Sequence, residues 1–281
     1  MPGVASKKKS PVKKKVTGDK KKGKVKALPL SGSEPLFTEK RCGTPAGIRS
    51  NNCYDYAFDS FSTARNQKSG PGNRTGLNRG MGPIKSCGLL PKGVQTNNPS
   101  GVYKTNPEKV FRPGYFKAMM FISPSNGRNI FNSGDFHFYR QHGKVEYKIK
   151  PKDTAKKIAT FFKIPVSRVT KANREKNKTN VFIPGKVIIL KVNGFSHKRG
   201  WATGPLLKDA SGKLIIDPRF SNNKYDGGLN YKKFCSAFCV RKNGEVVTGT
   251  PRNVNVNVKK NNVNNRIKKN RSIIENILGL R

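Results

Sequence analysis

Apolar and polar positions between residues 147 and 192 follow a pattern that predicts a strand, two helices and a second strand, in that order. Tyr147 and Ile149 alternate with lysines, which is the two-residue spacing of a strand with one buried face. Pro151 then ends the strand, because proline has no backbone N–H to donate to a ladder.

Two helices are predicted in the middle of this stretch. Asp153 or Thr154 can cap the first one, and its buried face consists of residues spaced i, i+3, i+4 and i+7, namely Ala155, Ile158, Ala159 and Phe162. Ser167 can cap a second short helix that runs through Ala172 and Asn173. Pro184 and Gly185 then turn the chain into the β-branched run 187–190, which predicts the closing strand. A stretch as short as residues 147–192 can bury only a small apolar core. We therefore expect its two strands to pair and both helices to cover one face of that strand pair.

This stretch resembles a LysM domain, a module that binds glycans containing N-acetylglucosamine, such as peptidoglycan and chitin. The resemblance is carried by the aromatic-led strand, the Pro-x-Asp-Thr turn, the Ala-Asn pair in the second helix and the Asn-x-x-x-Pro-Gly turn. It implies that sugar binds between two loops, whose residues are Pro151, Lys152, Asp153, Thr154, Asn180, Val181, Phe182, Ile183 and Pro184. Lys152 stands where the family usually has glycine. An alternative is that the module only spaces or docks other proteins.

The segments on either side of the module predict a second domain. Cys53 opens a helical pattern with Tyr56 and Ala57, and residues 134–140 alternate strictly, which predicts a half-exposed strand with His137 on its polar face. His142 stands beside a glycine and is expected in a turn. The predicted fold class is α+β.

We divide the chain accordingly. Residues 42–140 and 193–250 form one domain, the module at 145–192 is inserted between two of its strands, and both ends are disordered basic tails at residues 1–41 and 251–281.

A thiol and several imidazoles suggest chemistry in the larger domain. A cysteine in the first turn of a helix can have a lowered pKa, and it becomes a nucleophile when an imidazole takes its proton and a third group holds that ring. Cys53 meets the first condition, and His137 and His197 lie on strand-like segments on either side of the module.

The order of these residues resembles the papain-like cysteine amidases and peptidases of the CHAP and NlpC type, which cleave peptidoglycan cross-links. A closer local resemblance is to a group of phage, bacterial and large-DNA-virus proteins, and the matching segments are 52–57, 134–140, 196–200, 209–219 and 234–240. The resemblance implies a papain-like amidase-type fold and, as a hypothesis, these catalytic residues: Cys53 as nucleophile, His197 as general base, His137 as a second polar group or alternative base, and Asp209 or Asp217 to orient the ring. Buried cysteines and strand histidines are also common without catalysis.

Charge dominates the composition, since the 281 residues carry a formal net charge of +43. Residues 7–26 hold eleven lysines and one aspartate, and residues 252–281 hold eight Lys or Arg and nine asparagines. A surface of this charge attracts anions such as nucleic acid, anionic membranes or acidic wall glycans. We see no apolar run that could span a membrane and no secretory signal.

The five cysteines form an odd set, and their spacing predicts neither a metal site nor a cofactor. Mostly free thiols from a reducing cytoplasm are expected.

Taken together, the patterns and resemblances predict a glycan-binding component of a large DNA virus particle, with a cysteine amidase-type domain. Other virion proteins are expected as further partners. The alternative is a non-enzymatic virion protein whose lysine-rich tails bind packaged DNA non-specifically.

Overall fold

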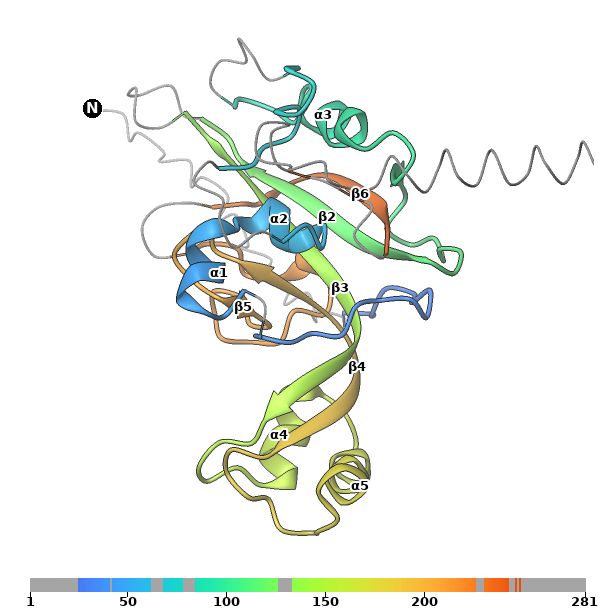
Figure 1. The fold of residues 1–281 in the computed structure, drawn as a ribbon, viewed down its shortest axis with the longest axis vertical. Helices are drawn as coiled ribbons and strands as arrows, with labels where there is room; N and C mark the ends of the chain where they lie inside the picture. Colours follow the sequence, from blue (N-terminus) through green and yellow to red (C-terminus); the bar gives the residue numbers. More distant parts are fainter. Residues whose placement is uncertain are drawn as a thin grey trace, which may run out of the picture.

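A single antiparallel sheet organises the protein. The computed structural model describes residues 25–40, 42–61, 68–77, 84–125, 133–225 and 230–242, with residues 246 and 248. Its six strands lie in the order β1-β6-β2-β3-β4-β5 (Figure 1). They are β1 (Val102–Thr105), β2 (Tyr115–Ser123), β3 (Asp135–Lys148), β4 (Val187–Lys198), β5 (Pro205–Leu206) and β6 (Lys233–Arg241). Helices and an antiparallel sheet together confirm the α+β class.

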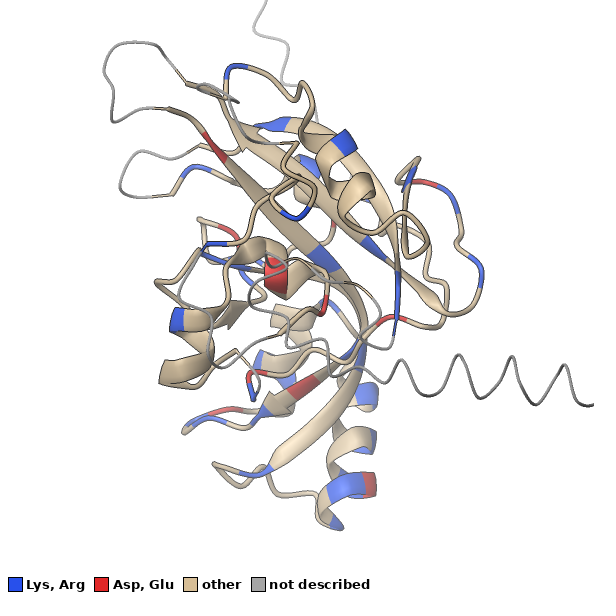
Figure 2. Cartoon of the chain, turned by 45° about the horizontal axis from the view of Figure 1, so that its top comes forward, with Lys and Arg blue, Asp and Glu red and all other residues tan. Residues whose placement is uncertain are grey.

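Short helices pack around this sheet. They are α1 (Pro45–Ser50), α2 (Cys53–Ala57), α3 (Leu90–Asn97), α4 (Ala155–Phe162) and α5 (Val166–Asn177), and a 3-10 turn, η1, spans Pro218–Phe220. In Figure 1, α1 to α3 lie beside the broad part of the sheet, whereas α4 and α5 lie at its narrow end, which consists of the far halves of β3 and β4. Lys and Arg outnumber Asp and Glu on both parts (Figure 2).

The broad part of the sheet is buried on both faces. Alternate residues of β2 and β3 enter two different cores: Met120 and Phe138 pack with the α2 side chains, and Met119 and Tyr139 pack with Tyr225. The expected half-exposed strand at 134–140 is therefore wrong in its burial, because the loops after β5 cover the face that carries His137. Alternation showed which residues share a face, but it carried no information about what covers that face.

The module is a continuation of the β3–β4 hairpin. Both strands run out of the broad sheet, with a register shift between His142 and Lys144, and their far halves pair from Lys144↔Lys191 to Lys148↔Val187. The two helices lie between these strand halves in the chain and share with them one core that contains Ile158, Phe162, Val169, Ile188 and Leu190. The predicted order of strand, helix, helix and strand is confirmed.

Residues 25–40, here called the N-terminal strap, differ from the predicted disordered linker. Gln141 Nε2 donates to the Leu28 carbonyl at 3.0 Å, and Phe37 joins β3 through Phe37 N to Lys144 O at 2.9 Å. The Phe37 ring is 2% exposed and belongs to the module core. The strap is ordered because apolar side chains and backbone groups of this segment fill positions along β3. Residues 1–24 and 251–281 lie outside the described residues.

A disulfide joins Cys87 to Cys235, with Cα atoms 5.5 Å apart, and it closes a loop with a sequence separation of 148. Cys42, Cys53 and Cys239 are free thiols. Among the described residues, no helix has the length and apolar character that a membrane span requires.

Candidate glycan loops and candidate catalytic centre

Backbone hydrogen bonds bring the two predicted glycan loops together. Ile149 N donates to Lys186 O, and Gly185 N donates to Ile149 O, each at 2.8 Å. Only Lys150 separates Ile149 from the first loop, and only Gly185 separates the second loop from Lys186. The two loops therefore leave the same end of the hairpin side by side, although they are some thirty residues apart in the chain.

Asp153 shapes the first loop. Its carboxylate accepts from the Tyr147 hydroxyl at 2.7 Å and from Lys150 N at 2.8 Å, and Thr154 caps α4 by accepting from Lys157 N. Lys152 has φ +63°, in the left-handed region where a side chain is unfavourable. This conformation explains physically why glycine suits the position, and it leaves the Lys152 side chain exposed on the loop.

Asn173 holds the second loop. This fully buried amide on α5 donates to Thr179 O at 2.8 Å and to Val181 O at 3.1 Å. From the sequence, Asn173 was singled out only as part of the Ala-Asn pair of the second helix. A polar residue beside apolar helix positions was the signal for this role. The amide pins the loop so that Val181 and Ile183 are 64% and 41% exposed, while Phe182 packs on the module core.

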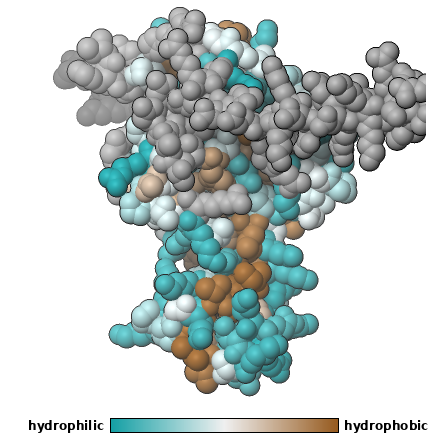
Figure 3. All heavy atoms as spheres, viewed as in Figure 1, coloured by the Kyte–Doolittle hydropathy of each residue, from teal (hydrophilic) through white to brown (hydrophobic). Residues whose placement is uncertain are grey.

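The remaining predicted glycan residues also lie at the surface. Those that are exposed are Pro151, Lys152, Thr154, Asn180 and Pro184, and Asp153 is half-buried. Exposed apolar atoms beside polar groups are what a sugar ring contacts, since it presents both C–H faces and hydroxyls. Figure 3 shows hydrophobic surface running along this end of the molecule between hydrophilic edges.

Comparison with known families agrees with this geometry. Residues 147–191 match the LysM domain. The match starts two residues after the predicted boundary at 145 and ends one residue before that at 192, and it covers the last two residues of β3, the two loops, both helices and β4 as far as Lys191. A LysM module implies binding of peptidoglycan- or chitin-type glycans. Neither the curated proteins nor the solved structures contain a match to this chain.

Outside the LysM module, the predicted nucleophile lies against β3. Cys53 is the first residue of α2, where Asn52 and Asp55 form a capping box. Its sulfur lies 3.8 Å from the Phe136 carbonyl oxygen and also contacts the backbone of Phe138. Burial raises the pKa of the Cys53 thiol to about 12, so this thiol is protonated at neutral pH.

His137 and His197 are brought together on neighbouring strands. His137 Nε2 lies 2.8 Å from His197 Nδ1, and His197 Nε2 lies 3.1 Å from the Lys208 carbonyl oxygen. A carbonyl only accepts, so His197 carries its proton on Nε2, its Nδ1 accepts, and His137 Nε2 donates. Since burial lowers the pKa of both imidazoles, both rings are neutral, and the lone pair of His137 is on Nδ1.

The thiol and the histidine pair lie along the same stretch of β3 but on its two faces: Cys53 belongs to the core that contains Phe138, and the His137 ring stacks on Tyr231 in the other core, with centroids 4.6 Å apart. Phe136 and Phe138, which contact the Cys53 sulfur, are the residues on either side of His137. Among the described residues, no hydrogen bond joins this thiol to an imidazole. The described contacts therefore place the sulfur on the strand backbone and join the two rings to each other.

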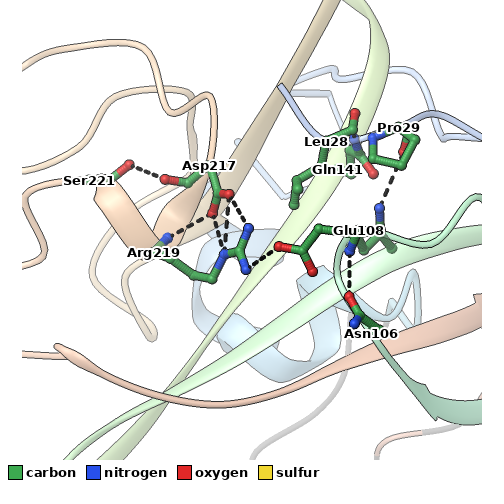
Figure 4. Close-up of polar contacts among 9 residues, drawn as sticks. Leu28, Pro29, Asn106, Glu108, Gln141, Asp217, Arg219 and Ser221 are labelled. Carbon is green, nitrogen blue, oxygen red and sulfur yellow. Dashed lines mark hydrogen bonds and ion pairs between the residues drawn. The ribbon is translucent and has the colours of Figure 1, made fainter. Parts of the chain in front are cut away.

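The two predicted orienting carboxylates are engaged elsewhere. The Asp209 carboxylate accepts hydrogen bonds from the backbone N–H groups of Ser211, Lys213 and Asn222 in a turn. Asp217 caps η1, and its carboxylate forms an ion pair with the Arg219 guanidinium (Figure 4). Glu108 binds the same guanidinium at 2.6 Å. The partners of His197 are instead the Lys208 carbonyl and, at 3.3 Å, the Tyr225 hydroxyl. A backbone carbonyl that orients a histidine ring cannot be recognised in a sequence, because every residue has one.

His142 also differs from its predicted place in a turn, because it is fully buried within β3. Its Nδ1 lies 2.7 Å from the Pro35 carbonyl oxygen, and its Nε2 bonds the Ser196 hydroxyl, which in turn bonds Tyr56 at 2.6 Å. This chain of bonds ties the N-terminal strap to β3, β4 and α2. No three His, Cys, Asp or Glu side chains within the described ranges are grouped so as to hold a metal ion.

The three buried histidines make stability depend on pH. Their pKa values in the folded protein are lowered, to about 4 for His197, below an unfolded value of about 6.5. The unfolded chain then binds more protons below about pH 6.5, so the stabilisation is complete above that pH and is lost as pH falls towards 4. We expect the free energy of unfolding, measured by urea titration, to fall across this window by about 3 kcal/mol for His197 alone.

A His197→Gln variant serves as the comparison. It lacks the titrating imidazole, so its free energy of unfolding should fall less steeply between pH 6.5 and pH 4 than that of the unchanged protein. Equal slopes would show that His197 is not held neutral.

Proposed function

We propose that the protein binds glycans containing N-acetylglucosamine through the two adjacent loops of its LysM module. The observation that carries this proposal is the LysM match over 147–191, with the matched loops joined at Ile149 and Lys186. The loops expose Val181 and Ile183, which provide apolar surface for the C–H face of a sugar ring.

Replacing these two side chains together, Val181→Ser with Ile183→Ser, is expected to weaken binding to insoluble peptidoglycan or chitin about tenfold or more. The reason is the loss of apolar contact with the sugar, since both side chains are exposed and are not needed for the module core. Sedimentation of the protein with the polymer gives the affinity. Val110→Ser, at a position 68% exposed outside the module, is the control. Unchanged retention of the double variant would contradict this binding site.

We also propose that the larger domain is a cysteine amidase or peptidase of the papain-like type. Three features support it: the Cys53 sulfur contacts the residues that flank His137, His137 is hydrogen-bonded to His197, and His197 is held by a carbonyl. This arrangement favours roles that differ from the predicted ones. His137 is the general base, because it is the ring on the strand that the thiol touches, and His197 is the positioning residue.

The chemistry follows from the protonation states. Cys53 starts as a neutral thiol and His137 as a neutral base with its lone pair on Nδ1. As the sulfur attacks the carbonyl carbon of an amide, the thiol proton passes to His137, which then gives it to the leaving amine. Water hydrolyses the thioester, releasing the acid and restoring the thiol. In a wall polymer the bond would be an amide of the peptide part.

A virion location and a nucleic-acid partner for the lysine-rich tails remain proposals. The first tail is best tested by deleting residues 1–24, because the N-terminal strap that follows is packed on β3. We expect the deletion, which removes ten lysines, to reduce salt-sensitive retention on duplex DNA and to leave glycan sedimentation unchanged. Equal retention on DNA with and without the tail would exclude this role.

A further inference from the structure

Positive charge is concentrated on the LysM module itself, apart from the tails. Residues 147–192 contain thirteen Lys or Arg and two acidic residues. Figure 2 shows Lys and Arg positions distributed along the helices and strands of the module. A neutral polymer such as chitin carries no negative charge to pair with these cations.

The two acidic residues of the module do not neutralise the loops. The Asp153 carboxylate is used internally by Tyr147 and by the Lys150 backbone, and Glu175 lies 3.8 Å from Lys171, one turn away on α5. Within the described module, no ion pair reaches Lys152 or Lys186. Both side chains are exposed.

The backbone places these two lysines next to the candidate sugar site. Lys152 lies in the first loop, and Lys186 follows the second loop after Gly185 and pairs with Ile149. Lys157 Nζ is anchored on the Lys152 carbonyl at 2.9 Å, which adds a third cation beside the first loop. A glycan that lies between the loops therefore has exposed lysines close to it at both loops.

We propose that the LysM module selects N-acetylglucosamine polymers that carry carboxylates, as in peptidoglycan with its peptide carboxylates and the lactyl carboxylates that bear no peptide, over neutral chitin. This inference rests on the proposed glycan binding and adds the substrate class. Lys152 and Lys186 are the specificity-determining residues. Their exposed charges attract carboxylates and are screened by salt, so the preference is largest at low ionic strength.

The test compares two tetrasaccharides by calorimetry with the full chain: neutral chitotetraose, and alternating N-acetylglucosamine and N-acetylmuramic acid with free carboxylates. In about 50 mM salt, we expect the carboxylated sugar to bind about fivefold or more tighter, and the difference to shrink in about 500 mM salt. Lys152→Gln with Lys186→Gln should remove most of the preference and leave chitotetraose affinity within about twofold.

A matched variant tests whether the preference comes from the two loop lysines or from the total positive charge of the module. Lys144→Gln with Lys191→Gln removes the same charge from two exposed lysines that pair across β3 and β4, away from the loops. We expect it to keep the preference. Equal affinity for both sugars, or equal loss in both double variants, would overturn the inference while glycan binding stands. A loss of duplex DNA binding in the loop variant, with no change for the sugars, would assign the lysines to nucleic acid and also overturn it. Absence of binding to either sugar would instead contradict the proposed function.

Discussion

Cys53→Ser is expected to lower peptidoglycan hydrolysis by about a thousandfold or more, because a serine hydroxyl is a much weaker nucleophile than a cysteine thiol. The side chain is 3% exposed and serine is nearly the same size, so the fold should be retained. Loss of wall turbidity and release of free amino groups measure the activity. Sedimentation with peptidoglycan should be unchanged, since Cys53 lies outside the LysM module.

Two other thiols provide controls. Cys42 is buried beside Arg140 and Lys198, and Cys239 is half-buried on β6. Serine at either position should leave hydrolysis near its original rate. If Cys53→Ser retains full activity, or if the purified chain releases no amino groups from any wall preparation, the catalytic proposal is wrong. His137→Ala should be as inactive as Cys53→Ser, because the two groups act in one proton transfer.

Phe37→Ala is expected to lower the free energy of unfolding by about 3–5 kcal/mol. The ring is 2% exposed in the module core and lies edge-on to His142, with centroids 5.5 Å apart. Its backbone pairs with Val145, so the substitution leaves a cavity where the N-terminal strap, the broad sheet and the LysM module meet. Urea unfolding measured at pH 7 gives the free energy.

Leu36→Ala tests whether this effect belongs to burial. Leu36 is the adjacent residue and is 37% exposed, so its truncation should cost about 1 kcal/mol or less. Glycan sedimentation by the Phe37 variant adds a second measurement, because a weakened junction should reduce binding even though Phe37 lies outside 147–191. Equal stability of the two variants would mean that the strap does not anchor the module.

The LysM module could be predicted from the sequence to a greater extent than the candidate catalytic centre of the larger domain. In the LysM module, the strand alternation at Tyr147, the helical spacing from Ala155 to Phe162 and the turn at Pro184 are local, and each agrees with the structure. The histidine pair depends on the register Tyr139↔His197, which joins residues separated by the whole module. Nothing near His197 in the chain indicates that Lys208 supplies a carbonyl to it.

The sequence by itself determined the order of the module elements, the two candidate glycan loops and the concentration of lysines, because residue periodicity, turn residues and charge act over a few neighbouring positions. Only the tertiary structure decided that the strap of residues 25–40 is packed, that β3 is buried on both faces, and that His137 meets His197 while Asp209 and Asp217 do not. These features come from contacts between distant segments, where burial and hydrogen bonding depend on which surface a strand happens to meet.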